Sequence, residues 1–482
     1  MSTTIGRFSV EAVAAPQKIA LGPRLKYLGL TLLLAWHYCL WFVPASFPAH
    51  FLLDDRITFA WLIALTTGGA VPLVLAWRLG RRHHLPATGP LVWAVAGTGS
   101  AATVALITVG MSSSSVAPAY VSAVLIGASG GVLWVLWGES LARHKARFTL
   151  ERVAPTYGIV MIVLVGGAFL LPGWGAPTVD ALLPLVSAVL LRQHGRALPD
   201  AQYPRLLPVK VATGGMRTIA VVTVISFAAA CASYYTVAIV PWEALGKVQN
   251  GFTLGILLGA VMLLLLAALQ AVPMWRQSTY RAYPWLLLFS VTACVLYLAD
   301  TRFQAGAFLL ALAISSLFEV LLTMYMGVLT RHGYVPPATA FALSGGAIRL
   351  GILVGNGTAL VYERVPGLHD LLVRPTFVVV VVGLTVLLIS MVRQEYAIDA
   401  LTQSPQSATD LKQIIALVAE EFRLSERERE ILALIGQGYT ASAVAESLVI
   451  SPHTVNTHVQ HIYGKLGIHK RSELISYLHR RG

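Results

Sequence analysis

The stretch LSEREREILALIGQGYTASAVAESLVISPHTVNTHVQHIYGKLGIHKRSELISYLHRRG, residues 424–482, is polar and divided by glycines, whereas nearly all of the chain before it is apolar. Ser425 and Glu428 form the Ser-x-x-Glu pattern that satisfies the free amides at a helix start. An apolar run follows, and Gly436 and Gly438 are expected to end this first helix. We therefore expect a small helical module attached to a body of membrane-protein character.

Two further helices are expected in this module. Thr440 can cap a short helix that runs to Leu448. Ser451 and Pro452 predict the start of a third helix, because serine caps a helix and proline fits its first position. Gly467 is expected to end it.

The third helix has one apolar and one polar face. The apolar stripe recurs at helical spacing and must pack on the first two helices: Val455, Val459, Ile462 and Leu466. The opposite face carries polar or small residues: His453, Asn456, Thr457, Gln460 and Gly464. A polar-faced helix held by a short helix and a tight turn is the geometry that places side chains in the DNA major groove. There, Asn and Gln amides can pair with adenine edges and a Thr methyl can contact thymine.

The two runs LSERERE-IL and ISPHTV-x-x-H, the second followed by KLG, resemble the LuxR-type (FixJ/NarL-type) helix-turn-helix of bacterial regulators. The resemblance implies that the third helix reads double-stranded DNA and that Thr454 and Lys465 contact its backbone. It also places His458 in the DNA-binding set. A fourth helix, at about residues 471–479, is expected to form a homodimer surface.

Three positions depart from the usual LuxR-type pattern. Asn456 and Gln460 stand where basic residues are common, and Ala443 stands where an acidic residue is usual. These changes predict weaker attraction to phosphates or a shifted base preference. The alternative is a helical interaction module that never touches DNA.

The composition of the whole chain is that of a polytopic membrane protein. Of its 482 residues, 56% are hydrophobic and only 12% are charged, and the mean hydropathy is +0.70. The net charge of +13 does not come from the module, since residues 424–482 hold seven basic and five acidic side chains. Cys39, Cys231 and Cys294 all lie in apolar runs, which indicates neither a disulfide framework nor a zinc site.

The apolar stretches predict an all-α bundle of twelve membrane-spanning helices. They lie near residues 25–43, 57–77, 89–110, 116–137, 153–171, 176–191, 218–240, 252–272, 284–300, 305–329, 338–361 and 375–392. This divides the chain into a tail (1–24), a first six-span half (25–191), a connector (192–217), a second half (218–392), a linker (393–423) and the four-helix module (424–482).

The distribution of basic residues predicts the orientation of the bundle. If the N-terminus is cytoplasmic, the inner loops and tails up to residue 393 hold twenty Lys and Arg, whereas the outer loops hold five. Because cytoplasmic loops are enriched in Lys and Arg, we expect both termini on the cytoplasmic side of the cell (inner) membrane.

Two six-span halves joined by a cytoplasmic connector resemble the layout of the major facilitator superfamily. The segment Arg78-Leu79-Gly80-Arg81-Arg82 is similar to the end of that superfamily's motif G-x-x-x-D-R-x-G-R-R. Leu73 and Trp77 replace its first glycine and its aspartate. The departure argues against the gating role of the motif, and with it against active transport.

Two charges inside the predicted spans are candidates for a sensing site. Glu319 and Arg349 lie near the middle of the tenth and eleventh spans, where a charge facing lipid is costly. They either contribute to a midplane ligand site or form an ion pair that fixes helix packing. His37, Tyr234 and Tyr235 could line the same cavity or serve only in packing.

No nucleotide-binding loop, metalloprotease motif, catalytic triad spacing or carboxylate pair occurs in the soluble stretches. The sequence thus predicts no enzyme, no cofactor and no metal site. It favours a membrane-embedded one-component transcriptional regulator, in which the bundle senses a small-molecule ligand and controls a DNA-binding domain. The alternatives are a transporter that carries a regulatory module and a bundle that serves only as an anchor.

Overall fold

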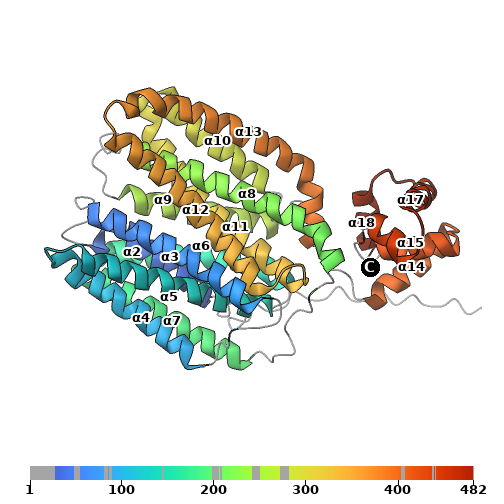
Figure 1. Cartoon of the computed structure of the whole chain (residues 1–482), viewed down its shortest axis with the longest axis horizontal. Helices are drawn as coiled ribbons and strands as arrows, with labels where there is room; N and C mark the ends of the chain where they lie inside the picture. Colours follow the sequence, from blue (N-terminus) through green and yellow to red (C-terminus); the bar gives the residue numbers. More distant parts are fainter. Residues whose placement is uncertain are drawn as a thin grey trace, which may run out of the picture.

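A computed structural model describes residues 28–47, 55–80, 85, 89–143, 146–197, 206, 209–241, 250–271, 282–402, 408–436, 439 and 441–480. In these ranges all regular secondary structure is helical, forming a large bundle and a small C-terminal domain (Figure 1). This confirms the all-α class. The predicted tail, residues 1–24, lies outside the described residues, as do Arg81, Arg82 and Thr440.

The bundle contains two sets of six apolar helices. The first set is α2 (Leu28–Phe42), α3 (Asp55–Leu79), α4 (Pro90–Ala105), α5 (Ala117–Ala142), α6 (Ala146–Leu170) and α7 (Gly175–Ala197). The second set is α8 (Val209–Ile239), α9 (Gly251–Ala271), α10 (Tyr283–Ala299), α11 (Gln304–Arg331), α12 (Pro337–Arg364) and α13 (Leu368–Thr402). Helices suit these segments because a backbone in lipid must satisfy its hydrogen bonds internally.

Ten of the described helices are long and apolar enough to cross a membrane, and α2 and α10 are shorter apolar helices. Their positions match the twelve predicted stretches, while the number of twelve spans stays a prediction. Helices α7 and α8 extend to Ala197 and from Val209, so they occupy both ends of the predicted connector, residues 192–217.

The two halves meet along equivalent helices. Helix α3 packs on α12, and α6 packs on α9. Helices α3 and α9 are the second helices of their halves, and α6 and α12 are the fifth. In both pairs, the second helix of one half therefore contacts the fifth helix of the other. This exchange is what a pseudo-twofold relation between the halves produces. Figure 1 shows the first half, blue to teal, beside the second half, green to orange.

Helix α12 lies unusually close to α8. A Cβ atom at Gly355 would overlap the carbonyl oxygen of Cys231 on α8, so only glycine allows this approach. Close approach of helices through small residues is typical of packing within membranes. Here it holds α12 and its Arg349 firmly within the bundle.

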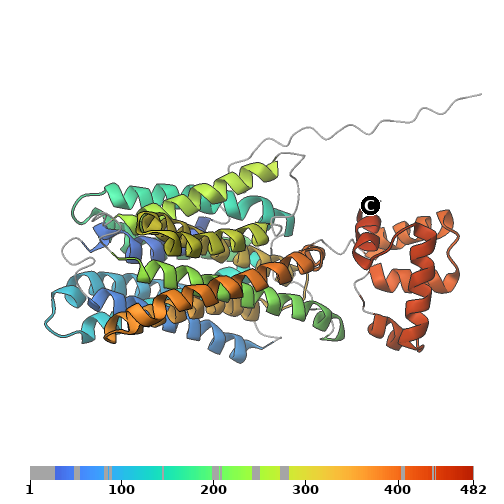
Figure 2. The same cartoon turned by 90° about the horizontal axis from the view of Figure 1, so that it is seen from above.

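The C-terminal domain has a hydrophobic core of its own. It consists of α14 (Ala408–Glu421), α15 (Glu426–Gly436), α16 (Ala441–Ser447), α17 (Pro452–Leu466) and α18 (Arg471–Arg480). Residues 408–421 were assigned to the linker by sequence, but Ile414, Ile415 and Val418 of α14 are buried in the same core as Ile431 and Leu432. Figure 2 shows the domain beyond one end of the bundle.

Candidate functional site

The start of α15 has the reciprocal cap that the sequence predicts. The Ser425 amide donates to Glu428 Oε2 at 2.7 Å, and the Glu428 amide donates to Ser425 Oγ at 3.2 Å. The same Oε2 accepts a hydrogen bond from Lys465 Nζ at 2.7 Å, and the Glu428 side chain is only 5% exposed. Glu428 therefore joins α15 to the end of α17.

Lys465 is held within the domain by this contact. Its ammonium group also donates to the carbonyl of Arg423 at 3.2 Å, which leaves one of its three donors for a DNA phosphate. Burial raises the pKa of Glu428, but hydrogen bonds from Lys465 and Ser425 outweigh it and hold this pKa below the usual 4.5. The Glu428–Lys465 pair therefore joins two helices within the domain, and the fold stabilises the charged form of Glu428.

The ends of α17 follow the expected signals. Ser451 Oγ accepts a hydrogen bond from the Thr454 amide at 3.0 Å. Gly467 follows the helix with φ 68°, a left-handed conformation that glycine adopts without strain.

The two faces of α17 are separated as the sequence predicts. Val455 and Ile462 are fully buried on the apolar face. The opposite side is exposed at His453, Thr454, Asn456, Thr457, Gln460 and Lys465, whereas His458 is half-buried. The Thr457 hydroxyl donates to the His453 carbonyl at 3.1 Å. A continuous polar surface is therefore available to a partner.

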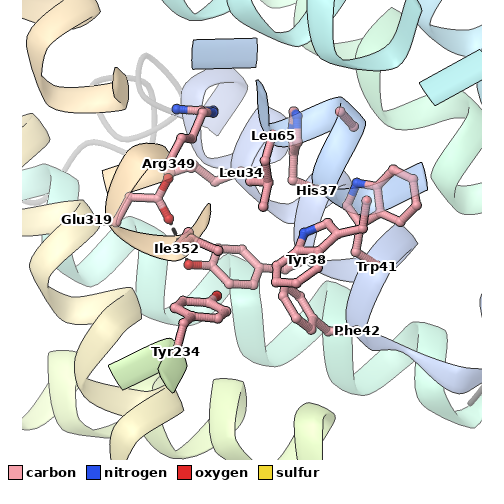
Figure 3. Close-up of a pocket in the computed structure, with 12 residues that line it drawn as sticks. Leu34, His37, Tyr38, Trp41, Phe42, Leu65, Tyr234, Glu319, Arg349 and Ile352 are labelled. Atoms are coloured by element: carbon pink, nitrogen blue, oxygen red, sulfur yellow. Dashed lines mark hydrogen bonds between the residues drawn. The ribbon is translucent and has the colours of Figure 1, made fainter. Parts of the chain in front are cut away.

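A small cavity in the bundle brings most of the predicted sensing residues together (Figure 3). It is lined by Leu34, His37, Tyr38, Trp41, Phe42, Trp61, Ala64, Leu65, Tyr234, Glu319, Arg349 and Ile352, from α2, α3, α8, α11 and α12. Its volume is about 40 Å³, enough for a water molecule or two. A larger ligand would require the surrounding side chains to move.

Glu319 is hydrogen-bonded to a residue that the sequence did not single out as a candidate. Tyr38 Oη donates to Glu319 Oε2 at 2.7 Å, across 281 positions of sequence. Tyr157, on α6, is also buried, and its hydroxyl has no hydrogen-bond partner among the described residues. Only the placement of Tyr38 next to His37 in sequence could have suggested its role.

Arg349 does not share a short ion pair with Glu319. Among the described residues, no ion pair within 4.0 Å joins the two. Instead Arg349 Nη1 donates to the Gly345 carbonyl at 3.1 Å, and the guanidinium lies 5.5 Å from the Trp134 ring centroid. The side chain is only 6% exposed. The sequence left two interpretations of these charges open. This geometry favours a ligand site over an ion pair that fixes helix packing.

His37 lies at the edge of the cavity. Its Nδ1 is 3.0 Å from the Leu33 carbonyl, and because a carbonyl only accepts, this nitrogen carries the hydrogen. Its ring packs edge-on against Trp36. The other nitrogen, Nε2, is therefore the acceptor.

The two adjacent tyrosines of α8 point in different directions. Tyr234 lines the cavity, with its hydroxyl toward the Tyr38 hydroxyl and the Glu319 carboxylate (Figure 3). Tyr235 does not line it; its ring packs on Phe377 of α13 and its hydroxyl donates to the Val373 carbonyl at 3.4 Å. Neighbouring residues of a helix are about 100° apart around its axis, so the prediction that groups Tyr235 with the site is corrected.

An aromatic layer closes one side of the cavity. The Phe42 ring lies 5.4 Å from that of Trp61, which lies 5.8 Å from that of Tyr234. Phe42 also contacts Phe252 of α9. Both halves of the bundle thus contribute rings to one packed layer beside Glu319.

Residues 423–478 match the family model "Bacterial regulatory proteins, luxR family". The C-terminal domain is a luxR-family helix-turn-helix domain. This agrees with the resemblance in the sequence and with the caps and faces of α17.

Relatives of this domain occur in other bacterial regulators. One segment is 48% identical over 54 residues to the oxygen regulatory protein NreC of Staphylococcus aureus (strain USA300), covering 11% of this chain and 25% of that protein. Another is 39% identical over 59 residues to an HTH-type transcriptional regulator of Mycobacterium tuberculosis (strain ATCC 25618 / H37Rv), covering 12% and 7%. The chain thus spans a quarter or less of these relatives, and the likeness is confined to the luxR-family domain.

Among solved structures, the chain is similar to the human organic anion transporter MFSD10 (TETRAN). The match has a TM-score of 0.47 and 15% sequence identity, and it covers 76% of this chain and 98% of that one.

The luxR-family domain touches the bundle through its last helix. Helix α18 packs on α13 as well as on α14 and α15. Burial raises the pKa of Tyr334, in the turn between α11 and α12, and the charge of Arg471 at the start of α18 opposes this. The turn that joins the two charge-bearing helices therefore lies close to α18.

Proposed function

We propose that this protein is a membrane-embedded one-component transcriptional regulator. A small molecule bound in the bundle controls how the luxR-family domain engages operator DNA. The observation that carries the proposal is the contact between α18 and α13, the last helix of the bundle. In addition, the α11–α12 turn connects the helices of Glu319 and Arg349 at one end, and the charge of Arg471 on α18 acts on Tyr334 of that turn.

The path from site to domain is short and made of rigid elements. Glu319 and Arg349 are each twelve residues from the ends of α11 and α12 that flank the turn, or about 18 Å at 1.5 Å per residue. A change in the relative position of these two helices at the cavity would therefore be transmitted to the turn. Such a shift moves the surface against which α18 lies.

The ligand acts by binding one bundle conformation more tightly than another. A coupling free energy of about 1–3 kcal/mol is typical of allosteric proteins and changes DNA affinity by about 5–150-fold. The cavity is nearly closed in this structure, so a ligand would favour a more open arrangement.

Helix α18 is the element on which the two functions meet. The LuxR-type resemblance assigns it to a homodimer surface, and here it packs on α13. We infer that the bundle and a second copy of the domain compete for α18. Two domains are needed for half-sites about one helical turn apart, so this competition would control operator binding.

The DNA contacts are proposed on the exposed face of α17. Asn456 and Gln460 offer amides for base edges, and Thr457, whose hydroxyl is used within the helix, offers its methyl group. His453, Thr454, His458 and the remaining donor of Lys465 complete the contact set. The domain then has to face the cytoplasm, which the twenty basic residues of the predicted inner loops support.

A second candidate function is a transporter that carries a regulatory module. It is favoured by the pseudo-twofold relation of the halves around a charged cavity. Leu73 and Trp77 disfavour it, because they replace the glycine and aspartate of the transporter motif. This function predicts uptake into vesicles that Glu319→Gln abolishes. Neither function requires an enzymatic activity, a cofactor or a metal.

The regulator function is tested by DNA binding of two forms of the protein. Residues 408–482 are used to select duplexes from a random pool, and the selected duplex is then bound to the full-length protein in nanodiscs. We expect Glu319→Gln and Tyr334→Ala to change the affinity of the full-length protein. Failure of residues 408–482 to select any duplex, or equal affinity of all full-length forms, would refute the proposal.

A further inference from the structure

A second cavity opens on the outer surface of the bundle between α3, α8 and α12. Its volume of about 450 Å³ falls within the range of about 300–1,000 Å³ that is usual for small-molecule sites. It is lined by Leu65, Thr66, Gly69, Ala70, Leu73, Thr223, Val224, Phe227, Ala342, Leu343, Gly346, Ala347, Arg349, Leu350 and Leu353. Leu73, Val224 and Leu350 are 48–55% exposed. The groove therefore faces the hydrocarbon chains of the membrane.

Almost every group in this groove is apolar. The hydroxyls of Thr66 and Thr223 donate to carbonyls of their own helices, at 2.8 Å each, and so offer no donor to a ligand. Arg349 is the one charged residue among the fifteen that line the groove. It also lines the inner cavity with Glu319, so this one side chain borders both spaces.

The charge of Arg349 is poorly compensated. Of its five N–H donors, one reaches an acceptor among the described residues, the Gly345 carbonyl. Glu319 accepts a hydrogen bond from Tyr38 instead of pairing with Arg349. A buried cation without a bonded counter-ion is costly inside a membrane. Such a site favours an anion.

Small residues of α3 and α12 line the groove. Gly69 and Ala70 on α3 face Gly346 and Ala347 on α12 along it. A Cβ atom at Gly346 would lie 3.9 Å from Leu73, which is an ordinary contact, so the groove is space that larger side chains could fill without displacing the backbone.

We propose that this groove binds a single-chain amphiphilic carboxylate taken from the bilayer. The hydrocarbon chain lies between α3, α8 and α12, and the carboxylate forms a charge-assisted hydrogen bond with Arg349. The inference rests on the proposed regulator function and names the class of its ligand. Because Arg349 borders the inner cavity, an anion bound to it competes with the attraction of Glu319 and so changes the fit of α12 against α11.

The probe is radiolabelled dodecanoate, bound to the full-length protein in phosphatidylcholine nanodiscs, with empty nanodiscs subtracted. We expect saturable binding, weakened about tenfold or more by Arg349→Gln, which corresponds to about 1.4 kcal/mol or more. Arg349→Lys keeps the charge and retains part of the binding. Gly346→Leu fills the groove and reduces binding without removing the charge. Val354→Leu, on the lipid-facing side of α12 outside the groove, is the matched control and binds as the wild type does.

Competition identifies the ligand class. Unlabelled dodecanoate displaces the probe, whereas dodecanol and acetate do so poorly. Equal binding by wild type and Arg349→Gln, or equal competition by dodecanol, overturns the proposal. Loss of dodecanoate binding in nanodiscs that contain phosphatidylglycerol would assign the groove to a two-chain lipid and also overturn it.

A separate readout distinguishes this inference from the regulator function. The affinity of the full-length protein for the selected duplex is measured with and without dodecanoate. Arg349-dependent binding with unchanged DNA affinity supports the ligand class and contradicts the regulator function. Absence of dodecanoate binding, while Tyr334→Ala still changes DNA affinity, refutes the ligand class alone.

Discussion

In the luxR-family domain, Glu428 is almost fully buried and accepts a 2.7 Å hydrogen bond from Lys465. In the bundle, Glu319 and Arg349 line one cavity, yet Glu319 is bonded to Tyr38 and Arg349 to a backbone carbonyl. The first pair joins two helices and uses its charges for stability. The second pair keeps its charges apart in an environment where that is costly. This difference is the reason why we propose a structural role for the first pair and a ligand-binding role for the second.

The largest effect is expected from neutralising the bundle cation. Arg349→Gln should abolish the ligand response, which amounts to about 5–150-fold in DNA affinity. It should leave thermal stability unchanged or raise it, because it removes a buried charge that has no bonded counter-ion. DNA affinity and melting temperature of the protein in nanodiscs test both points. A strongly destabilised variant would assign Arg349 to the structure rather than to the site.

The opposite result is expected for the pair in the domain. Glu428→Gln should lower the unfolding free energy of residues 408–482 by about 1.5–3 kcal/mol, the usual contribution of a hydrogen bond to a charged group. Glu426→Gln, an exposed residue in the same helical turn, is the control and should change it by less than about 0.5 kcal/mol. Urea denaturation measures both. Similar values for the two variants would remove the contrast between domain and bundle.

A smaller effect is expected on the DNA-reading face. Gln460→Ala should change the preference at one base position by about 1 kcal/mol, the lower end for an amide contact, and leave the salt dependence unchanged. Lys470→Ala removes an exposed positive charge just before α18. As the control for attraction to phosphates, it should weaken all sequences equally and reduce the salt slope by about one. Binding to a panel of single-base variants at several salt concentrations distinguishes them. An equal loss on every sequence for Gln460→Ala would exclude base reading.

The smallest effect is a dependence on pH. The pKa of Glu428 lies below its usual 4.5 in the folded domain, so its stabilisation is complete above that value and is lost as the pH falls through the folded-state pKa. The wild-type domain should therefore lose more stability than Glu428→Gln between about pH 6 and about pH 3. Parallel pH profiles of the two proteins would show that this carboxylate is not held in its charged form.

Local signals predicted the domain better than the bundle. The caps at Ser425 and Ser451 and the helix end at Gly467 involve neighbours within a few residues, so the sequence pattern contains all of their partners. The hydrogen bond from Tyr38 to Glu319 spans 281 positions, and no periodicity reveals it. Apolar stretches predict where helices lie in the membrane, but not which face of α8 carries the site, so Tyr234 and Tyr235 could not be told apart.

Contacts between residues far apart in the sequence also account for two differences between prediction and structure in the domain. Residues 393–423 were predicted to be a linker, but the part that forms α14 packs on helices later in the chain, so its place in the domain core required the structure. The LuxR-type resemblance implied a DNA-backbone contact for Lys465. Its contact with Glu428 depends on how α15 and α17 fold together, 37 positions apart.

We propose that the conformation of the bundle controls DNA binding, and that the bundle does more than hold the domain at the membrane. This proposal is tested by replacing residues 1–392 with an unrelated membrane anchor and measuring transcription from a promoter that carries the selected duplex. We expect that expression no longer responds to any compound that acts on the full-length protein, while the domain still occupies the promoter. An unchanged response from the anchored domain would contradict control of DNA binding by the bundle.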